Sequence, residues 1–143
     1  MDHGQRFRAH LLNAKALFET PRQGSDTRAN VASFDSMLFE CARARRIARD
    51  APDAVQGIGI DPEEFLGVMD EVAEHRNVME HWGDVIRPRA QTMYNHTTRA
   101  GLKIAVDESS MIIMGPEEIY KGQLNLYDVY TYIVAKLARA RTT

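Results

Sequence analysis

The chain has 143 residues, of which 44% are hydrophobic and 27% charged, and this length predicts one domain, residues 1–143, with a sizeable core. Its single cysteine, Cys41, excludes an intrachain disulfide and a zinc site made of cysteines. The formal net charge of -2 argues against a protein that holds long nucleic acid by overall charge, and only local basic patches stay open. No apolar run suited to a signal peptide or a spanning helix follows the polar N-terminus, so we expect a cytoplasmic protein outside the membrane.

The first half of the chain has the three-to-four spacing of apolar residues that is typical of amphipathic helices. Residues 5–19 form the first predicted helix. A second helix begins at a cap on Ser25 or Asp26 and runs to about Asp50, where Pro52 stops it, because the residue before a proline resists helical geometry.

The end of the second helix is strongly basic, with Arg43, Arg45, Arg46 and Arg49 in its last turns. These arginines fit the negative end of the helix dipole, where cations are favoured, and a solvated surface explains them. The same cluster also suits contacts with the phosphates of a nucleic acid. The sequence leaves both interpretations open.

The third helix has the strongest start signal in the chain. Asp61 is a cap, Pro62 takes the first helical position, and acidic residues occupy the first turn. Apolar residues then follow a near-heptad stripe until Pro88 ends or kinks the helix; they are Phe65, Met69, Val72, Met79 and Ile86. We expect this long helix to supply the centre of the core.

After residue 88 the period of the sequence changes. Residues 89–101 are polar and predict a connector, whereas Leu102, Ile104 and Val106 alternate with polar partners. Together with a returning strand at 111–114, they predict a β-hairpin at residues 101–114. Residues 119–126 form a third short strand or stay irregular, and a final helix covers residues 127–139.

The predicted fold class is therefore mainly α: an up-and-down helical bundle with its core in residues 5–88 and 127–140, and a small hairpin inserted before the C-terminal helix. A lone hairpin is marginal in water, so it must pack on the helices or on another chain. A homodimer is the expected assembly.

One motif in the third helix bears on function. The hexapeptide Arg76-Asn77-Val78-Met79-Glu80-His81 has the form Arg, polar residue, three residues, His. It resembles the motif of the HEPN family, whose members are compact helical bundles that carry the motif on a long central helix. The resemblance covers about residues 5–88 in architecture and this hexapeptide in detail.

The HEPN resemblance implies a metal-independent endoribonuclease without a cofactor, whose site forms where two subunits bring their motifs together. His81 takes the acid–base role, for which imidazole suits neutral pH, and Arg76 holds the phosphate. Asn77 orients the histidine or the phosphate. Many HEPN-like proteins are instead thought to be non-catalytic nucleotide-binding or assembly modules, and some have a cognate protein partner.

Helical geometry supports part of this site. A turn of about 100° per residue places Asn77 and His81 nearly in line on one face, which they share with Asp70, Glu74 and Asp84, whereas Arg76 lies about 140° from His81. The shared face is locally acidic, so RNA binding needs the basic cluster of the second helix or a partner subunit to offset it. A solvated face, with Arg76 paired to Glu80, is the alternative without a function.

Other groups of residues give weaker indications of function. A metal site is not expected, because Glu74, His75 and Glu80 scatter around the helix instead of forming Glu-x-x-His pairs on facing helices. Cys41 has no recognisable base beside it for nucleophilic catalysis. The rival function is a non-enzymatic interaction module, in which the hairpin and the tyrosine-rich last helix assemble the protein or bind a partner.

Overall fold

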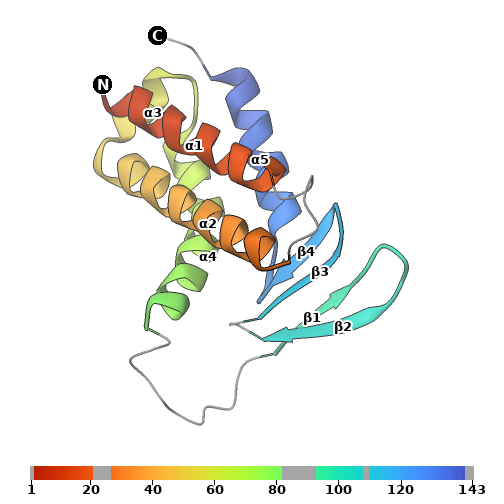
Figure 1. The fold of residues 1–143 in the computed structure, drawn as a ribbon. Coiled ribbons are helices and arrows are strands. Elements are labelled where there is room, and N and C mark those ends of the chain that lie inside the picture. The colour runs from red at the N-terminus through yellow and green to blue at the C-terminus, as the bar shows by residue number, and fades with distance from the viewer. Residues whose placement is uncertain (1, 21–26, 82–92, 108–109, 141–143) are drawn as a thin grey trace.

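The computed structural model describes residues 2–20, 27–81, 93–107 and 110–140, with only the backbone given for residues 27–29, 71 and 73–81. The elements in chain order are α1 (His3–Glu19), α2 (Thr27–Asp50), α3 (Pro52–Gly57), α4 (Pro62–His81), β1 (Met93–Thr97), β2 (Lys103–Asp107), β3 (Met111–Gly115), β4 (Glu118–Lys121), β5 (Leu124–Asn125) and α5 (Leu126–Arg139). Figure 1 shows the helices gathered on one side of the molecule and the strands on the other.

The four predicted helices are present, but the predicted cap at Ser25 or Asp26 and the predicted end of the third helix at Pro88 lie outside the described residues. The predicted cap at Asp61 is confirmed, and a cap at Asp2 was not predicted. Asp2 accepts a hydrogen bond from the backbone N–H of Gln5 at 2.8 Å, and the Gln5 side chain accepts one from the N–H of Asp2, which completes a capping box at α1. Asp61 accepts from the N–H of Glu63 at 3.0 Å at the start of α4. The short helix α3 was not predicted, since Pro52 was interpreted only as a stop signal.

The prediction of a mainly α bundle with a single hairpin at 101–114 is wrong. The described residues contain two antiparallel sheets, one ordered β1-β2 and the other β3-β4-β5, so the fold is mixed α and β. Strands β2 and β3 are both present, but β2 pairs with β1 and β3 pairs with β4. The expected connector at 89–101 therefore holds a strand, β1.

The hydrophobic core lies between the helices and one face of the larger sheet. Its buried side chains come from α1, α2, α4, α5 and the strands β4 and β5; they include Phe7, Leu11, Phe18, Phe34, Leu38, Phe65, Met69, Ile119, Leu124, Leu126 and Ile133. Aromatic rings join the helices, with Phe7 and Phe65 edge to face at 4.8 Å and Phe18 stacked on Tyr130 at 4.3 Å. The helices and the larger sheet thus share one core.

Strand β4 is buried on both faces because it lies between the helices and the β1–β2 hairpin. Ile119 packs into the helical core, whereas Tyr120, the next residue, points to the opposite face. There its ring lies 4.5 Å from the ring of His96 on β1, and Nε2 of His96 donates a hydrogen bond to the carbonyl oxygen of Gly122 at 2.8 Å. The hairpin therefore covers the face of the sheet that the helices leave free.

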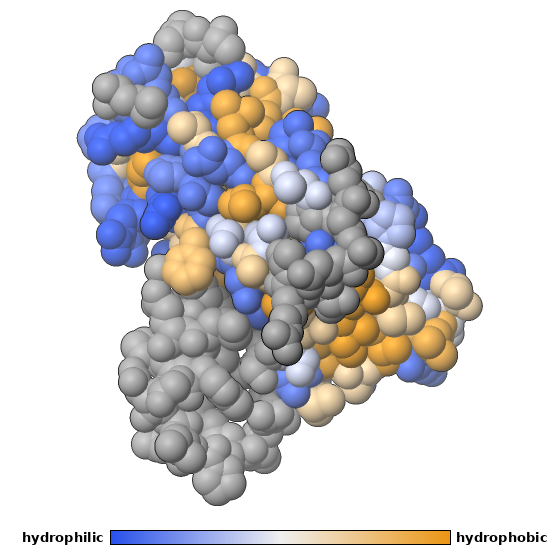
Figure 2. Space-filling model, in the orientation of Figure 1, coloured by the Kyte–Doolittle hydropathy of each residue, from blue (hydrophilic) through white to orange (hydrophobic). Residues whose placement is uncertain are grey.

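Large apolar side chains are exposed mainly on the strands. Met93, Leu102, Ile113 and Met114 belong to the strands and their turns, while Leu12 and Phe39 lie on the helices. Figure 2 shows hydrophobic residues gathered over the strand side of the molecule.

Candidate functional site

The motif residues Arg76, Asn77 and His81 occupy the last two turns of α4. Their backbone is helical, but their side chains lie outside the part of the chain that the structure describes. Figure 1 shows the end of α4 at the far end of the bundle from α3 and the N-terminus. The motif is therefore placed by its helix, and its neighbours must be inferred from residues earlier in α4.

An ion pair joins the basic end of α2 to the helix that carries the motif. Nε of Arg45 lies 2.9 Å from Oδ1 of Asp70, which is an exposed residue in the middle of α4. Asn77 and His81 follow Asp70 by seven and eleven residues, so each lies within about 20° of Asp70 around the helix axis. They are about 10 Å and 16 Å further along its axis. The ion pair thus joins the basic end of α2 to the middle of α4, on the helix face that Asn77 and His81 share further along.

The basic cluster itself is mostly paired with carboxylates. Arg43 contacts Glu40 at 3.2 Å and Arg49 contacts Asp50 at 3.3 Å, in addition to the pair between Arg45 and Asp70. Arg46 is exposed. Exposed ion pairs contribute about 0–1 kcal/mol, so a phosphate could replace these carboxylates at small cost.

A half-buried histidine that sequence reasoning missed lies between α1 and α2. Nδ1 of His10 lies 2.6 Å from one carboxylate oxygen of Glu40, and the other oxygen accepts the hydrogen bond from Arg43. The carboxylate can orient the imidazole. Because thirty residues separate the two groups in the chain, no local sequence pattern predicts their contact.

The neighbouring Cys41 supplies no nucleophile for this histidine. It is fully buried, and burial, with a smaller effect of the Glu40 charge, raises the pKa of its thiol to about 12. Because the thiolate is the reactive form, the thiol is inert near neutral pH. The expectation from the sequence that Cys41 is not catalytic agrees with this environment.

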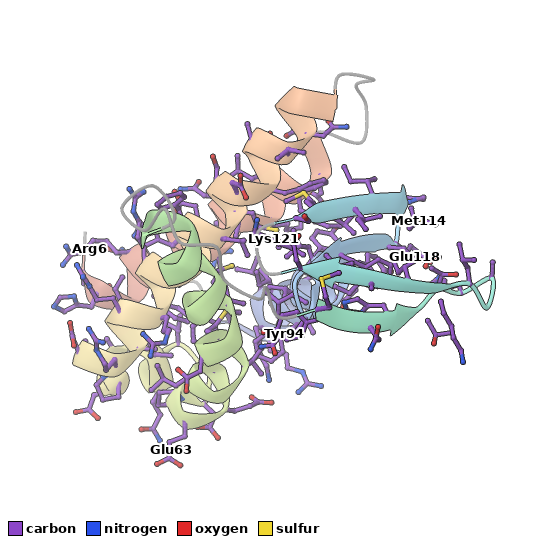
Figure 3. All side chains as sticks on the ribbon, turned by 90° about the horizontal axis from the view of Figure 1, so that it is seen from below. Arg6, Glu63, Tyr94, Met114, Glu118 and Lys121 are labelled. Carbon is purple, nitrogen blue, oxygen red and sulfur yellow. The ribbon has the colours of Figure 1, made fainter. Side chains whose placement is uncertain are left out.

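A buried lysine connects the larger sheet to α2. Lys121 of β4 has a side chain that is 2% exposed, and its Nζ lies 3.3 Å from Oδ1 of Asp35, whose side chain is 30% exposed. The contact is an ion pair without hydrogen-bond geometry, since Oδ1 of Asp35 has no hydrogen-bond partner among the described residues. Figure 3 shows Lys121 where β4 reaches the helices, and Glu118 and Met114 toward the other end of the strands.

Polar residues at that other end of β4 are satisfied by one another. Tyr120 donates a hydrogen bond to Glu118 at 2.8 Å, and the backbone N–H of Arg99 donates to the same carboxylate oxygen. The guanidinium of Arg99 forms an ion pair with Glu117. Burial, followed by the Glu118 hydrogen bond, raises the pKa of Tyr120. These contacts hold the hairpin on the sheet and present no reactive group to solvent.

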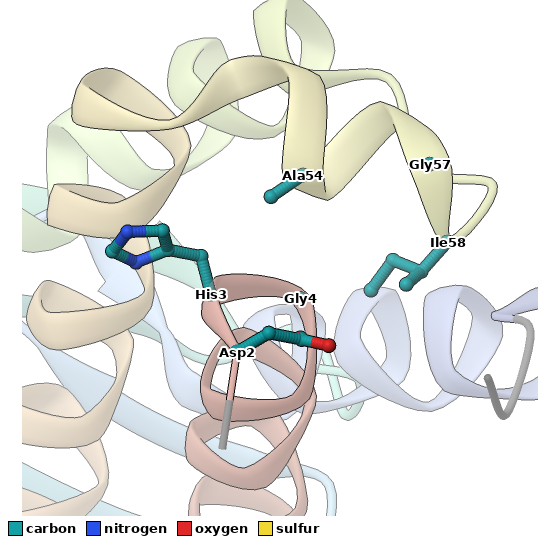
Figure 4. Close-up of a pocket in the computed structure, with 6 residues that line it drawn as sticks. All are labelled: Asp2, His3, Gly4, Ala54, Gly57 and Ile58. Carbon is teal, nitrogen blue, oxygen red and sulfur yellow. The ribbon is translucent and has the colours of Figure 1, made fainter.

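A shallow pocket of about 320 Å³ lies between the start of α1 and α3, as Figure 4 shows. It is lined by Asp2, His3, Gly4, Ala54, Gly57 and Ile58. The carboxylate of Asp2 already caps α1, so His3 is the other lining residue with a polar side chain. The pocket contains none of the residues predicted to form the site.

Among the residues that the structure describes, no group of three His, Cys, Asp or Glu side chains could hold a metal ion. None of the described helices has the length and apolar character needed to cross a membrane. Comparisons with protein-family models, curated proteins and solved structures find no match to this chain.

Proposed function

We propose that this chain is a cytoplasmic, HEPN-like RNA-binding domain that contacts RNA with the motif face of α4 and the basic end of α2. The observation that supports this proposal is the ion pair between Arg45 and Asp70, because it joins the basic end of α2 to the helix that carries the motif. The acidic character of the motif face was the main objection to RNA binding. Arg45 neutralises one carboxylate of that face, Asp70.

The role proposed for each residue follows from its chemical type. Arg76 binds a phosphate with its planar donors, and Arg46 adds an exposed positive charge on α2. In the cleavage reaction that the HEPN resemblance implies, a ribose 2′-hydroxyl attacks the adjacent phosphorus and the 5′-oxygen of the next nucleotide leaves. His81 takes the proton from the attacking hydroxyl or gives one to the leaving oxygen, and Asn77 orients these groups.

A cleavage assay in chelator tests the catalytic half of this proposal. The wild-type protein is incubated with a panel of structured and single-stranded RNAs, beside His81→Ala and the matched control His3→Ala, an exposed histidine at the far end of the bundle. We expect the wild type and His3→Ala to cleave, and His81→Ala to lose about 10²–10⁴-fold in rate. If the wild type leaves every RNA intact, the catalytic role must be abandoned.

A second candidate function, an interaction module without catalysis, is favoured by a separate observation. The exposed apolar side chains of the strands, notably Ile113 and Met114, lie on elements that hold none of the proposed RNA-contacting residues. Contiguous apolar surface of this kind marks protein interfaces. This candidate is compatible with RNA binding, since the two surfaces belong to different elements.

A further inference from the structure

Strand β3 is the last strand of its sheet and has an unpaired edge. Among the described strands it pairs only with β4, so the backbone groups along its other edge have no strand partner. Natural proteins protect such edges with charged residues, prolines or covering elements. β3 reads Met111-Ile112-Ile113-Met114-Gly115, with neither a charge nor a proline inside it. The residues of β3 therefore give its edge no such protection.

The side chains of β3 are also poorly covered. Ile113 is 40% exposed and its neighbour Met114 is 44% exposed, although both are large and apolar. The edges of the β1–β2 sheet differ: β2 carries Lys103 and Asp107, and the outward residues of β1 are Met93, which is 52% exposed, and the polar Asn95 and Thr97. Among the described strands, a run of four apolar residues along an unpaired edge is found in β3.

We propose that β3 pairs in antiparallel fashion with β3 of a second copy of this chain and joins the two larger sheets into one. A two-fold interface must be complementary to itself, so each residue of the strand must suit its counterpart. In an antiparallel pair related by a two-fold axis, one residue lies opposite its own copy. Centring on Ile112 sets Met111 opposite Ile113, and centring on Ile113 sets Ile112 opposite Met114.

Both registers place apolar residues opposite apolar residues and bring no charge into the contact. Directly opposed apolar side chains in neighbouring strands stabilise a sheet by about 0.2–1 kcal/mol per pair, in addition to the backbone hydrogen bonds. A second copy is therefore the partner that the sequence of β3 favours, and it gives the second candidate function its partner.

Sedimentation equilibrium at micromolar concentration tests the proposal with a matched pair of variants. Ile113→Lys places a charge on the edge strand, whereas Leu12→Lys changes an α1 residue of almost equal exposure, 39%. We expect the wild type and Leu12→Lys to have twice the monomer mass of 16.2 kDa. Ile113→Lys, with an unchanged circular dichroism spectrum, should dimerise about tenfold or more weakly.

Cysteine crosslinking provides a readout that does not depend on the folding of the lysine variant. Under mild oxidation, Ile112→Cys or Ile113→Cys should form a covalent dimer, because the residue on the two-fold axis lies beside its own copy. Met93→Cys, on the outward face of β1, should not, and the buried Cys41 cannot contribute. A monomeric wild type, or equal crosslinking of all three variants, would overturn the proposal. RNA binding is measured separately from dimerisation, since β3 carries no proposed RNA contact.

Discussion

The ion pair between Lys121 and Asp35 makes an asymmetric prediction about stability. Lys121 is 2% exposed and Asp35 is 30% exposed at the side chain, so the two partners are unequally desolvated. Asp35→Asn leaves the ammonium of Lys121 buried without its counter-charge. Lys121→Met leaves a carboxylate that is still partly hydrated, and the methionine fills the apolar part of the lysine site.

The magnitudes follow from this difference in burial. Removing one partner of a fully buried ion pair costs about 3–5 kcal/mol, and the partial exposure of Asp35 places Asp35→Asn near the lower end, about 3 kcal/mol. We expect Lys121→Met to cost about 1–2 kcal/mol, the penalty of a partly unsatisfied carboxylate. The double variant should be more stable than Asp35→Asn alone, because it leaves no unpaired charge.

Urea unfolding followed by circular dichroism measures these free energies of unfolding, provided that the slope against denaturant stays constant. If Asp35→Asn does not fold alone, restored folding in the double variant carries the same information. A Lys121→Met variant that is as destabilised as Asp35→Asn, or a double variant that is worse than both, would refute the reasoning from unequal burial.

Three further predictions concern the core. Cys41 should react with a thiol reagent only after unfolding. Because burial raises the pKa of its thiol from 9.0 to about 12, the folded state keeps the proton, and the free energy of unfolding should fall as pH rises from about 9 to 12. Urea titrations at each pH should show a less steep fall for Cys41→Ala. Tyr130→Phe should lower the free energy of unfolding by about 1–2 kcal/mol, because the Tyr130 hydroxyl donates a hydrogen bond to Glu19 at 2.7 Å. Tyr132→Phe should be neutral or stabilising, because the buried Tyr132 hydroxyl has no hydrogen-bond partner among the described residues. Thermal melts of the two variants distinguish destabilisation from stabilisation. Asn125→Ala should lower the free energy of unfolding by about 1–3 kcal/mol, since the Asn125 side chain caps α5 and binds backbone groups of the preceding loop and strand. A melting temperature equal to that of the wild type would contradict this role.

The helices could be predicted from the sequence because their signals are local. The cap at Asp61 and the proline at position 62 mark the start of α4, and the apolar period marks its buried side, on which Phe65 and Met69 lie. The end of α2 at Asp50 was predicted in the same way. The short helix α3 was missed, because six residues contain too few turns to show a period.

The strand pairing could not be predicted, because it depends on contacts that are distant in sequence. β2 and β3 look like a hairpin, since both are apolar and only a short turn separates them. The actual partner of β2 is β1, whose inward residues Tyr94 and His96 have little hydrophobic character. His96 gains its position from Tyr120 and Gly122, which are more than twenty residues away.

The candidate site likewise combines features that the sequence predicts with features that depend on distant contacts. The placement of Arg76, Asn77 and His81 on one long helix follows from local signals. The pairing of Arg45 with Asp70 does not, since it depends on how α2 crosses α4. Lys121 gave no sequence signal either, because lysine is among the residues least expected inside a core.

The most direct test of the proposed RNA contact is the salt dependence of RNA binding, measured by fluorescence anisotropy with a short single-stranded RNA. The wild type should bind, and Arg76→Ala should lower the affinity and reduce the slope of log K against log salt by about 0.7, which corresponds to one lost phosphate contact. Arg6→Ala, an exposed arginine of α1, should match the wild type. Binding by Arg76→Ala with unchanged affinity and slope would contradict the assignment of the α4 motif as the RNA contact.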